Sequence, residues 1–482
     1  MSVDTDIEMV AEDEVGGSRL TRPLRIILAI VIIADVLDLM DSTVTNIAAP
    51  TIVRNIGGGE SLIKWLGASY ALAMGVLLVV GGRLGDRYGK RRMLLVGMAG
   101  FVAASVVCGL SVNPTMLIAA RLVQGAFGAL MIPQGFSILS ATFSRAQLPT
   151  AFSVFAPVMG ISAVLGPIVA GLIIGANIGG LTWRPIFLIN IVLGSAGFAA
   201  ALKYLPHDEA DREAVIDGLG AGLLGASMFG FIYGLIEGST AGWTRTPILS
   251  LVFGVLLFAG FCVRQVTEVN PLIVPSLLKN RGFTAGMLLG FAYFAAVSGL
   301  AYVISLFFQT GLGLSPSRAA YGLSPVMIGM IGASIVFRPL IESLGRRLVV
   351  LGLVLTLAGA FGLWLTVTLQ GNPVSVWVLV PSLFVVGIGM GACFASIFEV
   401  ALGNLALSEG GSASGTLSAV QALATAVGSA VVTTVYFSQR EMHGPSHAMT
   451  VSVVVIGGIA ALSLALVWLL PRHAPAEDHA GH

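Results

Sequence analysis

Three acidic residues inside one long apolar stretch are the side chains of this sequence best suited to chemistry. Asp35, Asp38 and Asp41 lie three residues apart in the stretch that begins near Leu24. On a helix this spacing spreads them across one broad face. An ionisable group within a bilayer is costly, so its default interpretation is functional. We predict that this face lines a wet interior, where the carboxylates handle protons or contact a substrate. For Asp35 and Asp38 the alternative is plain solvation in that interior.

One basic residue, Arg121, also falls within an apolar stretch. Asp41 lies about five residues below the outer end of its predicted helix and Arg121 about six below that of its own, so at roughly 1.5 Å per residue they share a depth. Desolvation favours a neutral carboxyl, whereas a nearby guanidinium favours the carboxylate. A carboxyl that alternates between these surroundings can take up and release a proton. We predict an Asp41–Arg121 pair that couples protons; the alternative is a static structural ion pair.

The elements that hold these residues follow from composition. Of 482 residues, 56% are hydrophobic and only 10% are charged, whereas a soluble domain carries about 25% charged residues. Apolar stretches recur from Leu24 to Leu470, and with roughly 20 apolar residues needed per crossing they give about fourteen spans. The stretches are continuously apolar and do not alternate, which indicates helices and not barrel strands. We predict an all-α polytopic membrane protein with 14 transmembrane helices.

Orientation follows from the basic residues, which cytoplasmic loops retain. Most Lys and Arg fall in the tails and in the connections predicted to be cytoplasmic. The predicted outer loops hold Arg54, Lys64, Arg184, Arg245, Arg318 and Arg440. The first 18 residues are acidic, the reverse of a cleaved signal peptide, and are predicted to be a cytoplasmic tail. Both termini are therefore predicted to be cytoplasmic.

An internal repeat predicts the domain organisation. The segment Gly82–Arg92 (GRLGDRYGKRR) aligns with Arg338–Leu348 (RPLIESLGRRL), and transporters are often built from repeated halves. Each copy follows the second span of a six-span unit. We predict a cytoplasmic tail at 1–23, an N-terminal six-helix half at 24–205, a cytoplasmic linker at 206–217, two inserted helices at 218–267, a C-terminal six-helix half at 268–470 and a cytoplasmic tail at 471–482.

The residues of the first copy of the repeat are suited to a cytoplasmic gate. Its glycines permit a tight turn, Asp86 can cap the next helix or take a cationic partner, and its basic cluster keeps the loop inside. The predicted cytoplasmic gate consists of Gly82, Asp86, Arg87, Gly89, Lys90 and Arg91. Control of topology by charge alone is the alternative, and the recurrence of the pattern favours the gate.

Small residues mark the fifth predicted helix. Ser162, Gly166 and Gly171 permit close helix contact, while Pro167 removes one backbone donor and bends the helix. Such packing is common in membrane helices, so this pattern alone does not indicate a function and is interpreted together with the other motifs.

These motifs together resemble the major facilitator superfamily, and within it the fourteen-span drug:proton antiporters. GRLGDRYGKRR looks like the cytoplasmic loop signature of the superfamily. Asp41–Pro50 (DSTVTNIAAP), Leu117–Ala129 (LIAARLVQGAFGA) and Ser162–Gly171 (SAVLGPIVAG) resemble the signatures of spans 1, 4 and 5. Ser162 and Ala170 stand where glycines are usual, and both are small enough to preserve helix packing.

The resemblance implies a major facilitator fold of two six-helix halves plus two inserted helices. It also implies export of lipophilic drugs or antibiotics across the cell membrane by alternating access, driven by the proton gradient without a cofactor. It makes Asp41 the leading proton site and implicates Arg121 in proton transfer. Asp35 and Asp38 are additional to the signature, so which acid couples stays open. The expected partners are a small lipophilic substrate, protons and membrane lipid, and the protein is expected to be a monomer.

The substrate is not readable from the sequence. Tyr70, Gln124, Tyr293 and Gln309 are candidates for its cavity, although such side chains pack between helices at least as often. A net charge of +1 gives no case for nucleic acid. The histidines fall in loops or tails and the three cysteines are scattered, so neither an enzyme nor a metal site is predicted. The remaining alternatives are a proton-coupled importer and a non-transporting receptor or scaffold.

Overall fold

The computed structural model describes residues 20–144, 147–206, 208, 216–337, 340, 344–371, 374–402 and 410–470. Within these residues the chain forms fourteen α-helices of 20 residues or more, joined by short connections. In chain order they are α2 (Arg22–Ile56), α3 (Gly59–Tyr88), α4 (Lys90–Leu110), α5 (Pro114–Thr142), α6 (Leu148–Ala176), α7 (Pro185–Tyr204), α8 (Gly218–Ala241), α9 (Arg245–Thr267), α11 (Arg281–Leu306), α12 (Pro316–Phe337), α14 (Arg346–Gln370), α15 (Val376–Leu402), α16 (Gly410–His443) and α17 (Pro445–Leu466).

Twelve of these helices are long and apolar enough to cross a membrane, counting described residues only. The other two are α2, which carries the three aspartates, and α6, in which the apolar stretch found among the described residues is Leu165–Ala176. The prediction of an all-α polytopic protein is therefore confirmed, and the fourteen long helices are consistent with the predicted fourteen spans.

Local sequence explains where several helices begin. Asn113 accepts a hydrogen bond from the amide of Met116 at 2.8 Å, with a proline as the next residue. Asp217 caps α8 by accepting from Gly220 at 2.8 Å. Side-chain oxygens satisfy amides that lack a partner within the helix, and proline in the first turn needs no such partner.

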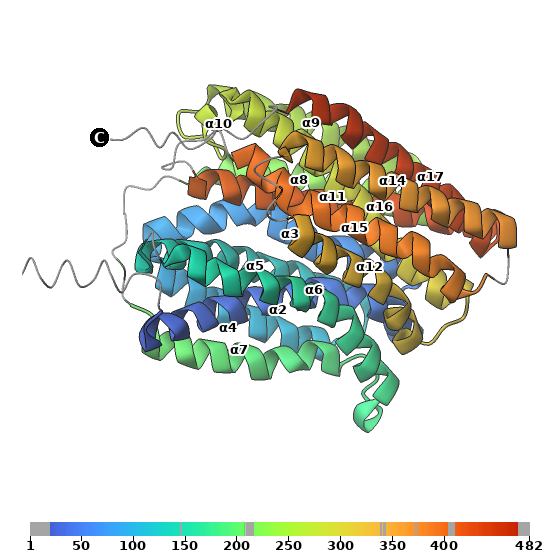
Figure 1. The fold of residues 1–482 in the computed structure, drawn as a ribbon, viewed down its shortest axis with the longest axis horizontal. Coiled ribbons are helices and arrows are strands. Elements are labelled where there is room, and N and C mark those ends of the chain that lie inside the picture. Colours follow the sequence, from blue (N-terminus) through green and yellow to red (C-terminus); the bar gives the residue numbers. More distant parts are fainter. Residues whose placement is uncertain are drawn as a thin grey trace, which may run out of the picture.

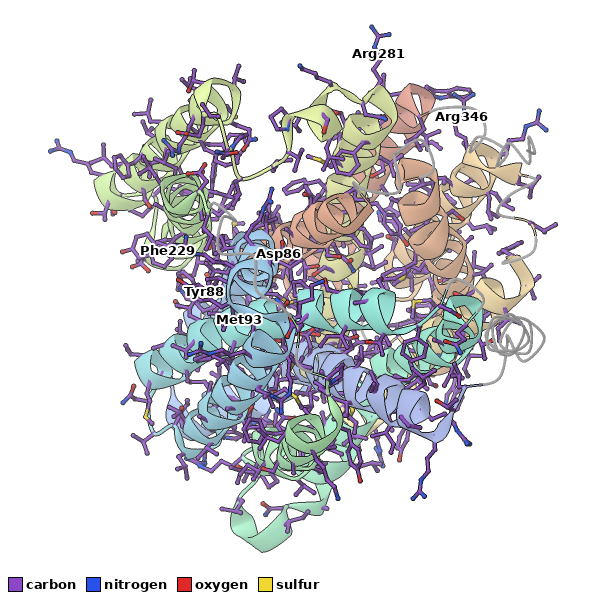
Figure 2. All side chains as sticks on the ribbon, turned by 90° about the vertical axis from the view of Figure 1, so that its left-hand side faces the viewer. Asp86, Tyr88, Met93, Phe229, Arg281 and Arg346 are labelled. Atoms are coloured by element: carbon purple, nitrogen blue, oxygen red, sulfur yellow. The ribbon has the colours of Figure 1, made fainter. Side chains whose placement is uncertain are left out.

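The helices form two bundles that lie side by side (Figure 1). One contains α2 to α7, the other α11 to α17, and they meet where α3 packs on α16 and α6 packs on α12. The helices α8 and α9 pack on each other at one side of the molecule, where α8 contacts both α3 and α16 (Figure 2). The residue limits of the predicted domains stay a prediction.

The bundles are joined firmly at the end where α2 finishes, which we call the sealed end. There the Ser305 hydroxyl of α11 donates to the Asn46 carbonyl at 2.8 Å, and the Ser317 hydroxyl of α12 donates to the Gly171 carbonyl at 2.6 Å. Tyr302 donates to a carbonyl of α3. A large apolar core with buried residues from both bundles continues this contact. We call the opposite end, where α2 begins, the terminal end.

Lys64 does not lie in an outer loop, so its predicted position is wrong. Because α3 begins at Gly59, Lys64 lies in the second turn of that helix and is fully buried. The side chains that cover Lys64 belong to α8 and α16, which lie far from α3 in the sequence.

Candidate functional site

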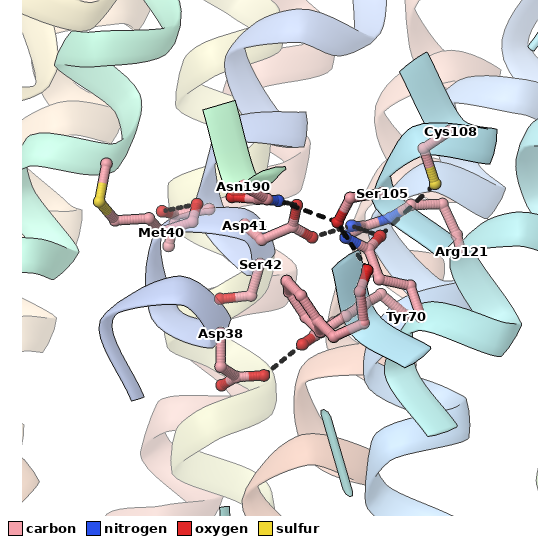
Figure 3. Close-up of polar contacts among 12 residues, drawn as sticks. Asp38, Met40, Asp41, Ser42, Tyr70, Ser105, Cys108, Arg121 and Asn190 are labelled. Carbon is pink, nitrogen blue, oxygen red and sulfur yellow. Dashed lines mark hydrogen bonds and ion pairs between the residues drawn. The ribbon is translucent and has the colours of Figure 1, made fainter. Parts of the chain in front are cut away.

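A buried ion pair lies near the middle of α2. Asp41 and Arg121 are each 1% exposed, and the Arg121 guanidinium of α5 donates to the Asp41 carboxylate (Figure 3). Asn190 of α7 donates to the other carboxylate oxygen at 2.8 Å. The structure thus brings Asp41 and Arg121 together as the depth argument predicted, while their role in proton coupling stays a prediction.

Further polar groups hold Arg121 in place. Gln124 accepts from the guanidinium at 2.8 Å and donates to the Ser105 hydroxyl of α4 at 2.8 Å. Asn190 donates to the same hydroxyl at 3.2 Å. The Arg121 Cζ atom lies 4.4 Å from the centre of the Tyr70 ring, within the range of a cation–π contact. The site is therefore one network drawn from five helices, α2, α3, α4, α5 and α7.

The other two aspartates face glycines of α5. Tyr70 donates to Asp38, and a Cβ atom on Gly128 would lie 2.8 Å from the Tyr70 hydroxyl and 3.1 Å from Asp38. Asp35 is 6% exposed, and neither of its carboxylate oxygens has a hydrogen-bond partner in the described part of the chain. A Cβ atom on Gly135 would lie 3.8 Å from Asp35. The glycines thus leave room for a row of carboxyls that runs from Asp41 toward the terminal end.

A small void adjoins Asp41. It has a volume of about 10 Å³ and lies between α2, α6 and α7, lined by Asp41, Asn190 and apolar side chains that include Val169 and Ala170. This volume is roughly that needed for one water molecule. A residue of the predicted antiporter motif, Ala170, thus lies beside the same space as the buried carboxyl.

The first half of the antiporter motif packs on α2. Ser162 and Pro167 are buried in α6, and Ser162 donates at 2.7 Å to a carbonyl one turn earlier. A Cβ atom on Gly166 would lie 2.3 Å from the Thr43 hydroxyl and 3.3 Å from the Met40 carbonyl, so the Thr43 side chain or the helix would have to shift. Gly166 therefore permits the close approach of α6 to the helix that carries the aspartates.

The second half of the motif packs on the opposite bundle. A Cβ atom on Gly171 would lie 2.9 Å from the Ala320 side chain and 3.0 Å from the Pro316 carbonyl, both in α12. Gly171 also accepts the hydrogen bond from Ser317. One motif thus touches α2 in its own bundle and α12 across the seam.

The predicted gate residues around Gly89 form a helix start. Gly89 has φ +96°, a conformation that favours glycine, and directly precedes α4. The amides of Lys90 and Arg91 donate to the Asp208 carboxylate, the latter at 3.2 Å, and the Arg91 guanidinium donates to the Leu202 carbonyl at 2.7 Å. The cap on α4 therefore comes from Asp208 of the linker and not from Asp86.

The second copy of the repeat makes matching contacts. Gly345 has φ +46° and precedes α14, and the Arg346 guanidinium donates to the Leu470 carbonyl at 3.1 Å. In both bundles a basic residue at the start of the third helix thus binds a carbonyl near the end of the sixth. Residues 338–339 and 341–343 of this copy lie outside the described residues.

The remaining gate residues lie at the surface of the terminal end. Asp86 is exposed, the Arg87 guanidinium lies 5.7 Å from the centre of the Tyr88 ring, and a Cβ atom on Gly82 would contact Pro133 at 3.7 Å (Figure 2). No ion pair links Asp86 to the other bundle among the described residues. The gating role stays a prediction.

Replacing Asp208 by alanine tests the cap. The variant should lose about 1 kcal/mol of local stability, because two amides at the start of α4 lose their acceptor. Hydrogen exchange should then be faster at the first turn of α4 and unchanged at the first turn of α8, which Asp217 caps. Unchanged exchange at Lys90 and Arg91 would contradict the cap.

The four predicted cavity residues are all buried within the protein. Tyr70 and Gln124 belong to the polar network, and Tyr293 donates to a backbone carbonyl of α15 at 3.0 Å. Gln309 donates to a serine of its own segment at 3.3 Å, and its side-chain oxygen has no partner among the described residues. Contact with a substrate stays a prediction for all four.

The family description "Major Facilitator Superfamily" matches residues 31–429 and also 286–481. The chain belongs to the Major Facilitator Superfamily. It is therefore a membrane transporter and not an enzyme, and its resemblance to the superfamily is confirmed.

Relatives of this transporter carry names that refer to antibiotics. It is 39% identical to the "Probable actinorhodin transporter" of Streptomyces coelicolor over 415 residues, 85% of this chain and 72% of that one. It is 30% identical to the "Tetracenomycin C resistance and export protein" of Streptomyces glaucescens, over 90% of this chain and 79% of that one. It is also 30% identical to a "Methylenomycin A resistance protein" of Streptomyces coelicolor, with 97% of each chain covered.

Solved structures confirm the fold. The human organic anion transporter MFSD10 superimposes with a TM-score of 0.63 at 16% identity, over 93% of this chain and 100% of that one. A peptide transporter POT in complex with sulfate gives a TM-score of 0.66 at 16% identity, over 92% and 95%. At this identity the likeness establishes the architecture only.

Proposed function

We propose that this major facilitator exports small lipophilic molecules, antibiotics among them, across the cell membrane by alternating access driven by protons. The names of its relatives, which include export and resistance proteins, support the substrate class. The observation that carries the coupling is the fully buried Asp41–Arg121 pair beside a water-sized void. A buried charge pair with a changeable protonation state is the group most able to link proton binding to a conformational change.

The geometry suggests how the coupling operates. A proton that binds Asp41 removes its negative charge, and the Arg121 guanidinium then keeps the Gln124 oxygen and the rings of Tyr70 and Phe187, none of which carries a negative charge. Because a buried cation without its counter-ion is costly, the arrangement of α2 and α5 becomes unstable and the bundles move. When Asp41 is again a carboxylate, its proton has passed to solvent on the other side and the pair reforms.

The other expectations follow from the same proposal. The transporter needs no cofactor, because the proton gradient supplies the energy, and its partners are the substrate, protons and membrane lipid. Both termini face the cytoplasm, and the sealed end faces outside. The even number of long helices supports this, because it places the two ends of the chain on one side. It works as a monomer.

Proton movement in inside-out vesicles tests the function. Vesicles energised by respiration and containing the protein should release lumenal protons when a lipophilic antibiotic is added, and vesicles without the protein should not. Substrate uptake into the lumen should collapse when an ionophore removes the gradient. Movement of substrate in the opposite direction would favour an importer, and binding without any transport would favour a receptor.

Which aspartate takes the proton remains part of the proposal. Asp41 leads because it has the cationic partner, whereas Asp38 is bound by Tyr70 and Asp35 has no donor among the described residues. Asparagine substitutions made one at a time assign the site. Only at the coupling residue should the substitution abolish gradient-driven transport and leave substrate exchange without a gradient intact.

A further inference from the structure

Lys64 is a buried lysine that the mechanism above does not use. It is 0% exposed near the sealed end of α3. Its ammonium donates to the Ser239 hydroxyl at 2.8 Å and to the Thr240 hydroxyl at 3.3 Å, both in α8, and lies 5.5 Å from the centre of the Phe437 ring in α16. None of the ion pairs formed by described residues includes Lys64. A charged group in this setting is a functional candidate by default.

The contacts of Lys64 connect three groups of helices. Helix α3 belongs to the N-terminal bundle, α16 to the C-terminal bundle, and α8 to the inserted pair. On the α16 side, the Ser239 hydroxyl lies 3.2 Å from the Thr434 hydroxyl. On the α3 side, a Cβ atom on Gly225 would lie 3.1 Å from the Val76 side chain. Apolar side chains of α8 lie in one cluster with residues of both neighbours.

The two seams of α8 differ in strength. The α3 seam has two hydrogen bonds from an ammonium, which are stronger than a bond between neutral hydroxyls. The α16 seam has the hydroxyl pair of Ser239 and Thr434. The Phe437 ring of α16 faces the Lys64 ammonium of α3 and is not a contact of α8. When the sealed end opens, α3 and α16 must part, and α8 stays with the neighbour that holds it more tightly.

We propose that Lys64 fastens α8 to the N-terminal bundle, so that the inserted helices move with that bundle and the contact between Ser239 and Thr434 opens in every transport cycle. Lys64 is then a positioning residue of the gate at the sealed end, and α8 supplies part of that gate. The inference rests on the proposed alternating access but not on proton coupling or on the identity of the substrate.

Disulfide trapping of each seam tests the inference. Cys108, Cys262 and Cys393 are first replaced, since they are free thiols. The pair Ser239→Cys and Thr434→Cys then links α8 to α16 on oxidation, while Thr240 still accepts a hydrogen bond from Lys64. Substrate exchange should fall at least about tenfold and return when the disulfide is reduced, because the seam can no longer open.

A second pair is the matched control. Val76→Cys with Gly225→Cys links α8 to α3, and its oxidised form should exchange substrate at the rate of its reduced form. Equal rates for oxidised and reduced protein in the Ser239 and Thr434 pair would overturn the inference. Inhibition confined to the Val76 and Gly225 pair would also overturn it, because α8 would then move with α16.

Distance measurements keep the inference testable without any transport. Spin labels replace three exposed aromatic or aliphatic residues at the sealed end, Val112 in the N-terminal bundle, Trp243 after α8 and Trp377 in the C-terminal bundle. The 112–243 distance should stay constant when pH or substrate changes the 112–377 distance. In Lys64→Met the 112–243 distribution should broaden, and Lys64→Arg, which keeps charge and donors, should restore it. A 112–243 distance that changes together with the 112–377 distance in the native protein contradicts the inference. These distances do not depend on any transport assay, so they test the inference even if the proposed function is wrong.

Discussion

Replacing Asp41 by asparagine should abolish transport driven by a pH gradient while leaving substrate exchange without a gradient within about threefold of the native rate. The substitution keeps the shape of the side chain, and its single amide oxygen can still accept from Arg121, but its NH2 group then faces Asn190 and the side chain cannot change charge. Because an amide cannot take up and release a proton, gradient-driven transport should fall at least about 100-fold, which corresponds to about 2.7 kcal/mol in the coupled step. Proteoliposomes with and without an imposed gradient measure both rates with one substrate.

The matched control for this substitution is Glu268→Gln. Glu268 pairs with Arg264 at 2.9 Å on a partly exposed face, and pairs of this kind contribute little. It should leave both rates unchanged. If Asp41→Asn retained gradient-driven transport, the same comparison would be repeated with Asp38→Asn and Asp35→Asn, and the Asp41–Arg121 pair would be structural. A fall in both rates together would show that the substitution damages the fold.

The pairing of Asp41 with Arg121 was predictable because both lie at a depth that regular helices define. It holds although α2 continues past Pro50 to Ile56, beyond the predicted end of the first span. A membrane helix tolerates such a proline when neighbouring groups satisfy the freed carbonyl. The partners Ser105 and Asn190 were missed, because they are single polar residues in apolar helices and only the packing of α4 and α7 shows that they converge.

Contacts between distant segments were not predictable from periodicity. Lys64 was counted among the basic residues of the outer loops, whereas its burial depends on α8, about 175 residues later in the chain. Asp86 was predicted either to cap α4 or to take a cationic partner, whereas the cap comes from Asp208 of the linker. Sequence patterns report the surroundings of a helix face but not which segment covers it.

The glycines of the antiporter motif illustrate the same limit. Their size predicted close packing, and the structure confirms this by the clashes that a Cβ atom would make. What the spacing could not show is that Gly166 faces the helix with the aspartates and Gly171 faces the opposite bundle. Since one helix carries both contacts, we expect a shift of α6 against α2 to change the seam with α12.

Replacing Gly171 by valine should therefore open the sealed end without unfolding the bundle. Added atoms would meet the Ala320 side chain at 2.9 Å and the Pro316 carbonyl at 3.0 Å, so α6 and α12 must separate. Overpacking of this kind costs about 1–3 kcal/mol in the packed state, which corresponds to a population shift of roughly 5- to 150-fold toward states in which the two helices are apart. In a background that lacks the native cysteines, Ser317→Cys should react at least about fivefold faster with a membrane-impermeant thiol reagent.

A glycine inside one bundle separates this effect from simple destabilisation. A Cβ atom on Gly352 would lie 2.8 Å from the Gly389 carbonyl and 3.1 Å from the Ala392 side chain, contacts that join α14 to α15 within the C-terminal bundle. Gly352→Val should therefore lower the thermal midpoint without changing the reactivity of the cysteine at 317. Equal reactivity in both valine variants would mean that α6 and α12 do not part at Gly171, and that the seal depends on the other contacts between the bundles. A faster reaction in Gly171→Val only would make α6 the element that joins the aspartate helix to the gate, because it contacts Thr43 of α2 at one position and α12 at the other.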